Sequence, residues 1–247
     1  MDDRTTLKIQ RWTAWTGPVM VVTYLICWLI LGHNFPPPSP AFSGAELVDN
    51  YYLKHRGDIL LGMSFSAWLG VLYTAWSVQL SEQMRRREKM HVLSQLQLCG
   101  GILTGWLLVM CAAFWVWCAR FAGTPGIDPE LIKAVHTLAW YVYDMTWTVT
   151  AIQLVGCGVF AIVDRKEPAI YPAWAGWLAL VTAATFLPLT FLPYFESGPF
   201  AYNGWFSFHI VFGTWGIWFT TYSYYMFKDL RRINISPTLG VAQALGH

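Results

Sequence analysis

Six long apolar stretches constrain this chain more than any other feature. They cover approximately residues 13–32, 59–80, 97–119, 137–163, 173–195 and 205–227. An apolar run of about 18 or more residues is long enough to cross a bilayer as a helix. Only 12% of the residues are charged and 55% are hydrophobic, whereas soluble domains carry about a quarter charged residues. The sequence therefore predicts an all-α, polytopic membrane protein, with a single six-helix transmembrane domain over 1–233 and a flexible tail over 234–247.

The basic residues predict the orientation of this bundle. With the N-terminus inside, 12 of the 16 Lys and Arg residues fall in inside segments and 4 fall outside. Cytoplasmic segments carry such an excess of basic residues, so we expect N-in/C-in topology in a bacterial inner (plasma) membrane. Topology accounts for the basic residues, and no nucleic-acid partner is expected. The first stretch is too long for the apolar part of a signal peptide and is interpreted as an uncleaved helix.

The longest outer loop, 33–58, contains a helix-start pattern. Ser43-Gly44-Ala45-Glu46 has the spacing of a capping box, in which a serine and a glutamate each satisfy the other's free backbone N–H group. It predicts a short helix to about Lys54. We expect the apolar face of this helix to lie on the membrane or on the bundle.

Two further patterns concern the fourth and fifth helices. Asp128 followed by Pro129 is a typical helix start, and the fourth helix is expected to run from there to about Val163 without interruption. Pro188 and Pro193 predict a kink near the outer end of the fifth helix. Separately, three mid-span polar residues are expected to form hydrogen bonds between helices: Ser64, Thr148 and Gln153.

One carboxylic acid lies deep within the fourth stretch. Asp144 is about 9 Å inside the hydrocarbon if the helix enters it near Leu138. An ionisable group there is costly and marks either a functional site or a structural pair. Two interpretations remain open: a structural role, as a buried pair with Arg120 or as an acceptor for a Tyr or Trp donor, or a role in ligand binding or proton transfer.

Other polar groups belong to the same outer side of the predicted bundle. The candidate ligand-binding residues are Asp144, His209, Arg120, Glu196, Trp140 and Trp147, and the candidate catalytic residues are Asp144 and His136. Together they could line one cavity that opens toward the outer leaflet. His136 could instead be a wetted side chain at the interface, and His209 a helix-packing residue.

The sequence offers little support for a metal or a cofactor. His136 and Asp144 are separated by about 12 Å along a regular helix, whereas metal–ligand bonds are about 2 Å long, so the two cannot share an ion. The five cysteines all lie within predicted spans without metal-binding spacing. No metal site and no cofactor are predicted. A single b-type haem held by His136 and His209 is the alternative that their depths allow.

Two loop signatures carry a resemblance. The Pro36-Pro37-Pro38-Ser39-Pro40 run with the capping box after it, and the later turn from Gly198 to Gly204, resemble loops of an uncharacterised group of bacterial six-helix integral membrane proteins. The resemblance implies the same six-helix topology. It implies no activity and no site residues.

Three functions fit these features, and the sequence does not decide whether the protein is an enzyme. The first is binding or passage of a small lipophilic or aromatic molecule, whose polar end Asp144 and His209 would orient. The second is a membrane-embedded acid–base enzyme of the isomerase, cyclase or hydratase type, in which Asp144 acts with His136 as a relay. The third is an accessory subunit of a larger membrane complex. Expected partners are membrane lipids, a lipophilic small molecule, and further copies of the chain or other subunits.

Overall fold

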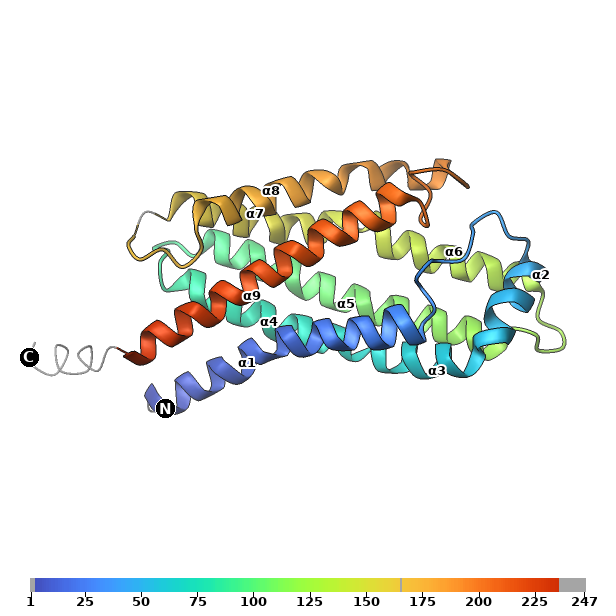
Figure 1. The fold of residues 1–247 in the computed structure, drawn as a ribbon, viewed down its shortest axis with the longest axis horizontal. Coiled ribbons are helices and arrows are strands. Elements are labelled where there is room, and N and C mark those ends of the chain that lie inside the picture. The colour runs from blue at the N-terminus through green and yellow to red at the C-terminus, as the bar shows by residue number, and fades with distance from the viewer. Residues whose placement is uncertain (1–2, 165, 236–247) are drawn as a thin grey trace, which may run out of the picture.

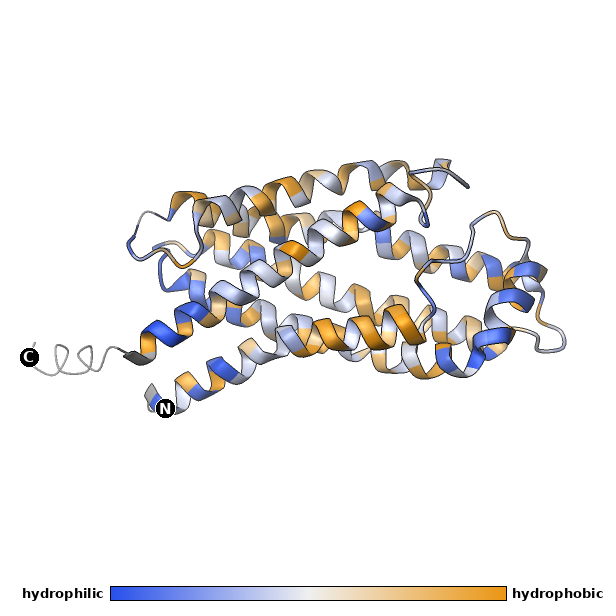
Figure 2. Ribbon diagram, viewed as in Figure 1, coloured by the Kyte–Doolittle hydropathy of each residue, from blue (hydrophilic) through white to orange (hydrophobic). Residues whose placement is uncertain are grey.

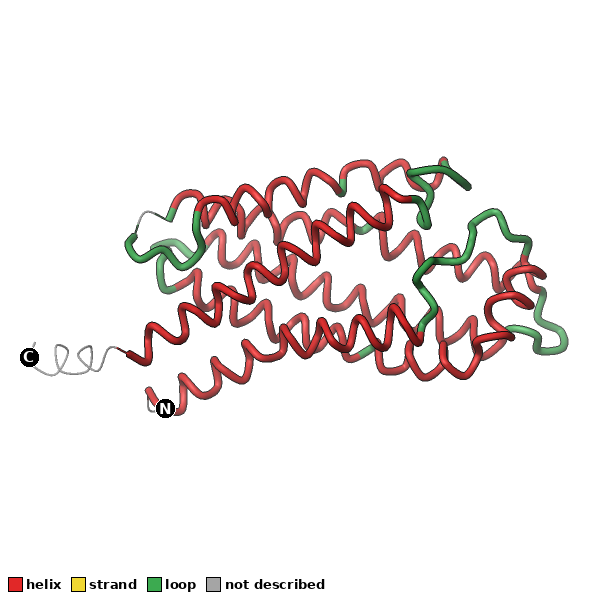
Figure 3. Tube along the Cα trace, in the orientation of Figure 1, coloured by secondary structure: helices red, strands yellow, loops and turns green. Residues whose placement is uncertain are grey.

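The computed structural model describes residues 3–164 and 166–235 (Figure 1). Helices make up 80% of the chain, and the described residues form no strand (Figure 3). The helices lie side by side in one elongated bundle, and α1 begins at the same end of the bundle at which α9 ends. The predicted all-α class is confirmed. Most of the predicted tail, 236–247, lies outside the described residues.

The helical elements follow one another with few loops. In chain order they are α1 (Asp3–Thr23), η1 (Tyr24–Leu31), α2 (Gly44–Leu47), η2 (Val48–Leu53), α3 (Lys54–Ser66), α4 (Trp68–Arg85), α5 (Val92–Phe121), α6 (Pro129–Met145), α7 (Trp147–Val163), α8 (Ala173–Thr185), η3 (Leu187–Tyr194), η4 (Trp205–Ile210) and α9 (Val211–Ile235). Of these, η1, η2 and η4 are π-helical and η3 is a 3₁₀ helix.

Five helical stretches in the described part of the chain are long and apolar enough to cross a membrane. They are Arg4–Leu31, Gly44–Arg85, Val92–Phe121, Pro129–Val163 and Ala173–Tyr194. Apolar residues dominate the middle of the bundle and polar residues gather toward its ends (Figure 2). The sixth expected span corresponds to η4 and α9, which form a helix but are not among the five, because Gly, Thr, Trp and Tyr residues lower the mean hydropathy there. The chain is therefore a helical membrane protein with at least these five candidate spans.

The capping box forms as predicted, but the helix after it does not stop. The Ser43 hydroxyl accepts a hydrogen bond from the Glu46 backbone N–H at 3.2 Å, and the Glu46 carboxylate accepts one from the Ser43 N–H at 2.8 Å. The helix continues past Lys54 into α3, with one non-helical residue, His55 (φ −120°, ψ 17°). The predicted end at Lys54 is wrong. The apolar face of this segment, including the buried Tyr52, packs on the bundle.

The fourth helix starts as predicted and is then interrupted. The Asp128 carboxylate accepts a hydrogen bond from the Glu130 N–H at 2.9 Å, which caps α6. The helix is not continuous to Val163, however, because it breaks at Thr146 (φ −81°, ψ 15°). The Thr146 hydroxyl donates to the carbonyl of Val142 at 2.7 Å, and such a bond to the preceding turn bends helices.

The fifth helix changes character at its prolines. The α-helix ends at Thr185, and 3₁₀ geometry takes over in η3, which contains Pro188 and Pro193. Proline has no N–H to donate to the helical ladder, so the change from α to 3₁₀ geometry falls at the two prolines for which a kink was predicted.

Close helix contacts and polar bonds hold the bundle together. The amide of Gln153 accepts from the Tyr73 hydroxyl at 2.6 Å and donates to Ser77 at 3.0 Å, which joins α7 to α4. The expected interhelical role of Gln153 is thus confirmed. Ser64 and Thr148 are exposed on the bundle surface, so the same expectation is wrong for them.

Candidate functional site

Asp144 lies in the last turn of α6, directly before the helix break. Regular α-helical geometry ends at Thr146, two residues after Asp144. Asp144 is 3% exposed, and within the described residues its Oδ2 atom is buried without a hydrogen-bond partner. A buried polar group without a partner is rare and costly in protein interiors. The unpartnered carboxyl oxygen therefore makes Asp144 a candidate functional residue.

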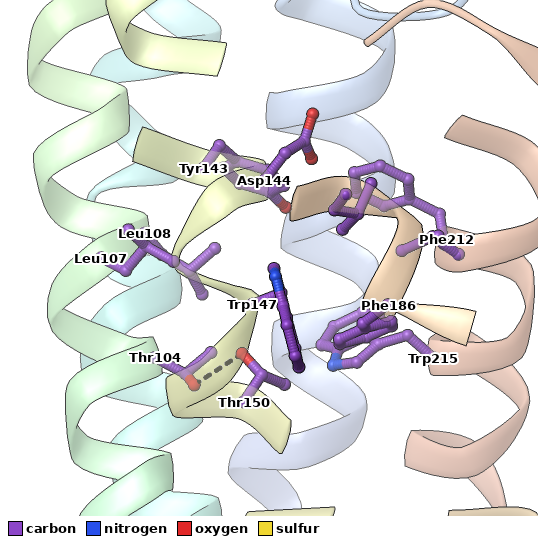
Figure 4. A pocket seen from close by; sticks show the side chains of 12 residues that line it. Thr104, Leu107, Leu108, Tyr143, Asp144, Trp147, Thr150, Phe186, Phe212 and Trp215 are labelled. Carbon is purple, nitrogen blue, oxygen red and sulfur yellow. Dashed lines mark hydrogen bonds between the residues drawn. The ribbon is translucent and has the colours of Figure 1, made fainter. Parts of the chain in front are cut away.

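A small cavity of about 60 Å³ lies beside this carboxyl group (Figure 4). The residues that line it come from α5 to α9: Thr104, Leu107, Leu108, Tyr143, Asp144, Trp147, Thr150, Phe186, Leu189, Val211, Phe212 and Trp215. The hydroxyls of Thr104 and Thr150 form a hydrogen bond of 2.9 Å with each other at its lower end. One water molecule takes up about 30 Å³ of liquid, so the cavity has room for one or two waters or one small polar group.

His136 belongs to a separate, fully bonded cluster. The Trp140 indole donates to Nε2 of His136 at 3.1 Å, so Nδ1 carries the proton and donates to the Tyr52 hydroxyl at 2.6 Å. Tyr202 stacks on Trp140 with 4.9 Å between ring centroids. Burial raises the pKa of the Tyr202 phenol. His136 is 1% exposed, so the expected wetted position is wrong.

The two hydrogen bonds of His136 bear on its expected roles as a haem ligand and as a relay to Asp144. Because both ring nitrogens are occupied, none is free to ligate a haem iron, and the bis-histidine arrangement with His209 does not fit. No hydrogen bond among the described residues links His136 to Asp144, so a direct relay between the two is not formed either.

A larger groove of about 300 Å³ opens between the first and the last helices. It is lined by Met20, Val21, Tyr24, Leu25, Trp28, Leu29, Phe35, Phe208, His209, Phe212, Gly213, Trp215, Gly216, Phe219 and Thr220. Nearly all of these side chains are apolar or aromatic, and the groove lies on the flank of the bundle. Pockets of about 300–1,000 Å³ with such linings are typical of small-molecule sites.

A stack of aromatic rings separates the groove from the Asp144 cavity. Trp28 lies parallel to Tyr24 at 4.8 Å and to Tyr143 at 5.5 Å, and Tyr143 stacks on Phe212 at 5.7 Å. Phe212 and Trp215 line both spaces. These rings therefore lie between the groove and the cavity that Asp144 lines.

Of the remaining candidate residues, Trp147 and His209 line the cavity or the groove, and Arg120 and Glu196 line neither. Trp147 lines the cavity and its indole donates to Thr190 at 3.2 Å. His209 is exposed and lines the groove. Arg120 and Glu196 are both exposed, and neither has a recorded contact with Asp144. Arg120 lies twelve residues beyond the cavity-lining Leu108 on α5, about 18 Å along the helix, so the proposed buried pair does not form.

Two features escaped the sequence analysis. The stack of aromatic rings includes Trp28, Tyr143 and Phe212, and mid-span aromatic residues at helical spacing predict packing equally well. The second feature is a cluster of His33, after the end of η1, with His55 and Asp58 of α3, whose metal-binding atoms lie within 4.8 Å of one another. The three-residue spacing of His55 and Asp58, typical of one face of a regular helix, was the available signal, and the prediction of no metal site overlooked it.

No protein-family model, curated protein or solved structure matches this chain. The fold and the site define a class only: a helical membrane protein with an aromatic groove on its flank and a buried carboxylic acid behind it.

Proposed function

We propose that the protein binds or passes a small lipophilic, aromatic molecule in the groove between η1 and η4–α9. The observation that carries this proposal is the groove of about 300 Å³ and its lining of aromatic rings. Flat rings prefer offset-stacked or edge-on arrangements with other rings. Trp28, Phe208 and Phe212 offer both kinds of surface to a molecule that enters from the membrane.

Asp144 would hold the polar end of that molecule. The carboxyl group lies just behind Tyr143, and its Oδ2 atom has no partner among the described residues. A rotation of the Phe212 or Trp215 ring, which line both spaces, would join the groove to the cavity. A hydroxyl or amine on the ligand would then supply the missing hydrogen bond, while His209 lies along the groove.

The proposed topology has six spans rather than five. The helix from Trp205 to Ile235 is about 46 Å long at 1.5 Å per residue, which exceeds the roughly 30 Å of hydrocarbon. Counting it as the sixth span puts both termini on one side, in agreement with the excess of basic residues there. We propose the N-in/C-in orientation in a bacterial inner membrane, which directs His209 and Phe35 toward the outer leaflet.

Native mass spectrometry of protein purified in mild detergent tests the binding role. The expected result is a small lipophilic molecule that stays bound to the wild type and is lost from Gly216→Leu. Within the described part of the chain, no atom lies within 4 Å of a Cβ placed on Gly216, so leucine there would fill the groove without disturbing the bundle. Thr148→Leu, at an exposed position outside the groove, is the matched control and should keep the molecule.

Two outcomes would contradict the proposal. Equal retention by both leucine variants would show that the molecule binds elsewhere. A copurified protein chain in place of a small molecule would favour the accessory-subunit role.

The unpartnered carboxyl group also favours a second function, an acid–base enzyme. General acids act when they reach the reacting group within hydrogen-bond distance in a site that excludes water. In that case Asp144→Asn would abolish conversion of the molecule and keep it bound as unconverted substrate. In a binding protein the same variant would weaken retention and leave the chemical identity of the bound molecule unchanged.

A further inference from the structure

We propose that His33, His55 and Asp58 form a binding site for one divalent transition-metal ion, with zinc as the best-fitting ion. The Nε2 atom of His33 lies 3.2 Å from Oδ2 of Asp58, and the two imidazole rings stack with 3.8 Å between centroids. One ligand atom from each of the three residues falls within 4.8 Å of the others. This site lies outside the groove and does not depend on its function.

The distances are close to those that a zinc ion requires. Zinc bonds of about 2.0–2.1 Å to nitrogen and oxygen place tetrahedral ligands about 3.3 Å apart. The contact between His33 and Asp58 already has this length, and a small rotation of the His55 ring would bring the third atom in. Two imidazoles with one carboxylate suit zinc and neighbouring first-row ions, and three protein ligands leave a fourth position for water or another ligand.

Hydrogen bonds on both sides of His33 hold the backbone turn that carries it. His33 follows η1 with φ of 52°, a left-handed conformation that few residues other than glycine adopt. The Tyr51 hydroxyl donates to the carbonyl of Gly32 at 2.7 Å, and the Asn34 side chain donates to the carbonyl of Trp28 at 3.0 Å. These two buried bonds hold the turn on either side of His33.

The other two proposed ligands, His55 and Asp58, both belong to α3. His55 is the one residue of α3 with non-helical φ and ψ, and Asp58 follows it by three residues. The non-helical backbone at His55 and the start of the regular helix after it bring one ligand atom of each residue within 4.8 Å of the other and of His33.

The surroundings admit a cation. The side chains of His33 and Asp58 are 32% and 60% exposed, so an ion can reach the site from the aqueous side. Two basic residues flank His55, Lys54 and Arg56, and the guanidinium of Arg56 donates to the carbonyl of Ala122. That bond draws its charge toward the end of α5. A bound ion would link the end of the first helix to α3, next to the Phe35 side of the groove.

Metal binding by tag-free, metal-stripped protein in detergent tests the proposal. Equilibrium dialysis with zinc should give one ion per chain, and cobalt in the same site should produce the visible absorption of a tetrahedral nitrogen–oxygen complex. H33Q, H55Q and D58N should each weaken zinc binding by about 100-fold or more, because even residues that only support metal ligands act on a 10- to 100-fold scale. H91Q is the matched control, since His91 also has a positive φ (57°) but belongs to the loop before α5, and it should bind zinc like the wild type.

The alternative is a plain ion pair between His33 and Asp58. In that case D58N would lower the melting temperature in metal-free buffer, and zinc would bind neither the wild type nor the variants, or would bind all of them equally. Either zinc result would overturn the proposal. If H33Q does not fold, D58N at the exposed position still decides, with size-exclusion chromatography and circular dichroism showing that it is folded.

Discussion

The indole Nε1 of Trp140 donates to Nε2 of His136 across one turn of α6, at 3.1 Å. This one contact determines the tautomer of a buried histidine, since the remaining proton must sit on Nδ1 and point at Tyr52. The result is a structural cluster within α6 that ties η2 to this helix.

Tyr52→Phe should destabilise the protein by about 1–3 kcal/mol, because it leaves the buried Nδ1–H of His136 without an acceptor. The midpoint of SDS-induced unfolding in mixed micelles measures the change. Tyr194→Phe provides the control, since Tyr194 is 81% exposed, and should leave the midpoint unchanged. An unchanged midpoint for Tyr52→Phe would mean that the Nδ1–H finds another acceptor.

Asp144→Leu should leave the free energy of unfolding unchanged or raise it by about 1–3 kcal/mol. The substitution removes a buried oxygen that has no hydrogen-bond partner among the described residues, and an unsatisfied buried polar group costs about that much. The same variant should lose the bound molecule, because leucine cannot bond to its polar end. A gain in stability with a loss of binding is the pattern of a residue kept for function. A clear loss of stability would instead indicate a structural pair for Asp144.

Asp229→Ala should destabilise the end of the bundle near α9's last turns by about 2 kcal/mol. The Asp229 carboxylate pairs with Arg86 and accepts from Gln83 at 3.0 Å, and Tyr171 donates to Gln83 at 2.6 Å. The network joins α4, α9 and the loop before α8. Thermal unfolding followed by circular dichroism measures the loss.

Glu82→Gln is the comparison for that network. The Glu82–Arg85 pair is 3.8 Å long and about half exposed on both sides, and exposed pairs of this kind contribute roughly 0–1 kcal/mol. A loss as large as that of Asp229→Ala would show that overall surface charge, and not the buried network, governs the stability of this end.

Gly100→Ala should separate α5 from α7 and destabilise the bundle by about 1–3 kcal/mol. A Cβ on Gly100 would lie 2.6 Å from the carbonyl oxygen of Val149 and 2.7 Å from the backbone nitrogen of Gln153. Neither backbone atom can yield easily. Gly213→Ala, with open space around its Cβ, should be neutral or stabilise by about 0.5–1 kcal/mol. If the two variants unfold alike, close backbone approach is not what holds α5 to α7.

The local chemistry of helix ends was readable from the sequence. The capping box at Ser43 and the cap at Asp128 form as predicted, because each depends on side chains within three residues of the helix start. The interruption at Thr146 was missed. A threonine bonds to the preceding turn in many unbroken helices, and the surrounding packing decides whether the helix then bends.

The sequence by itself determined the class of this protein. Long apolar stretches with few charges leave helices as the way to satisfy the backbone in hydrocarbon, and Asp144 stood out within them. The tertiary structure decided what surrounds that carboxyl group. It placed Asp144 beside a cavity and away from Arg120, enclosed His136 with Tyr52 and Trp140, and brought His33 against His55 and Asp58. The physical reason is helix rotation: depth follows from counting residues along one helix, but neighbours depend on which face each helix turns toward the others.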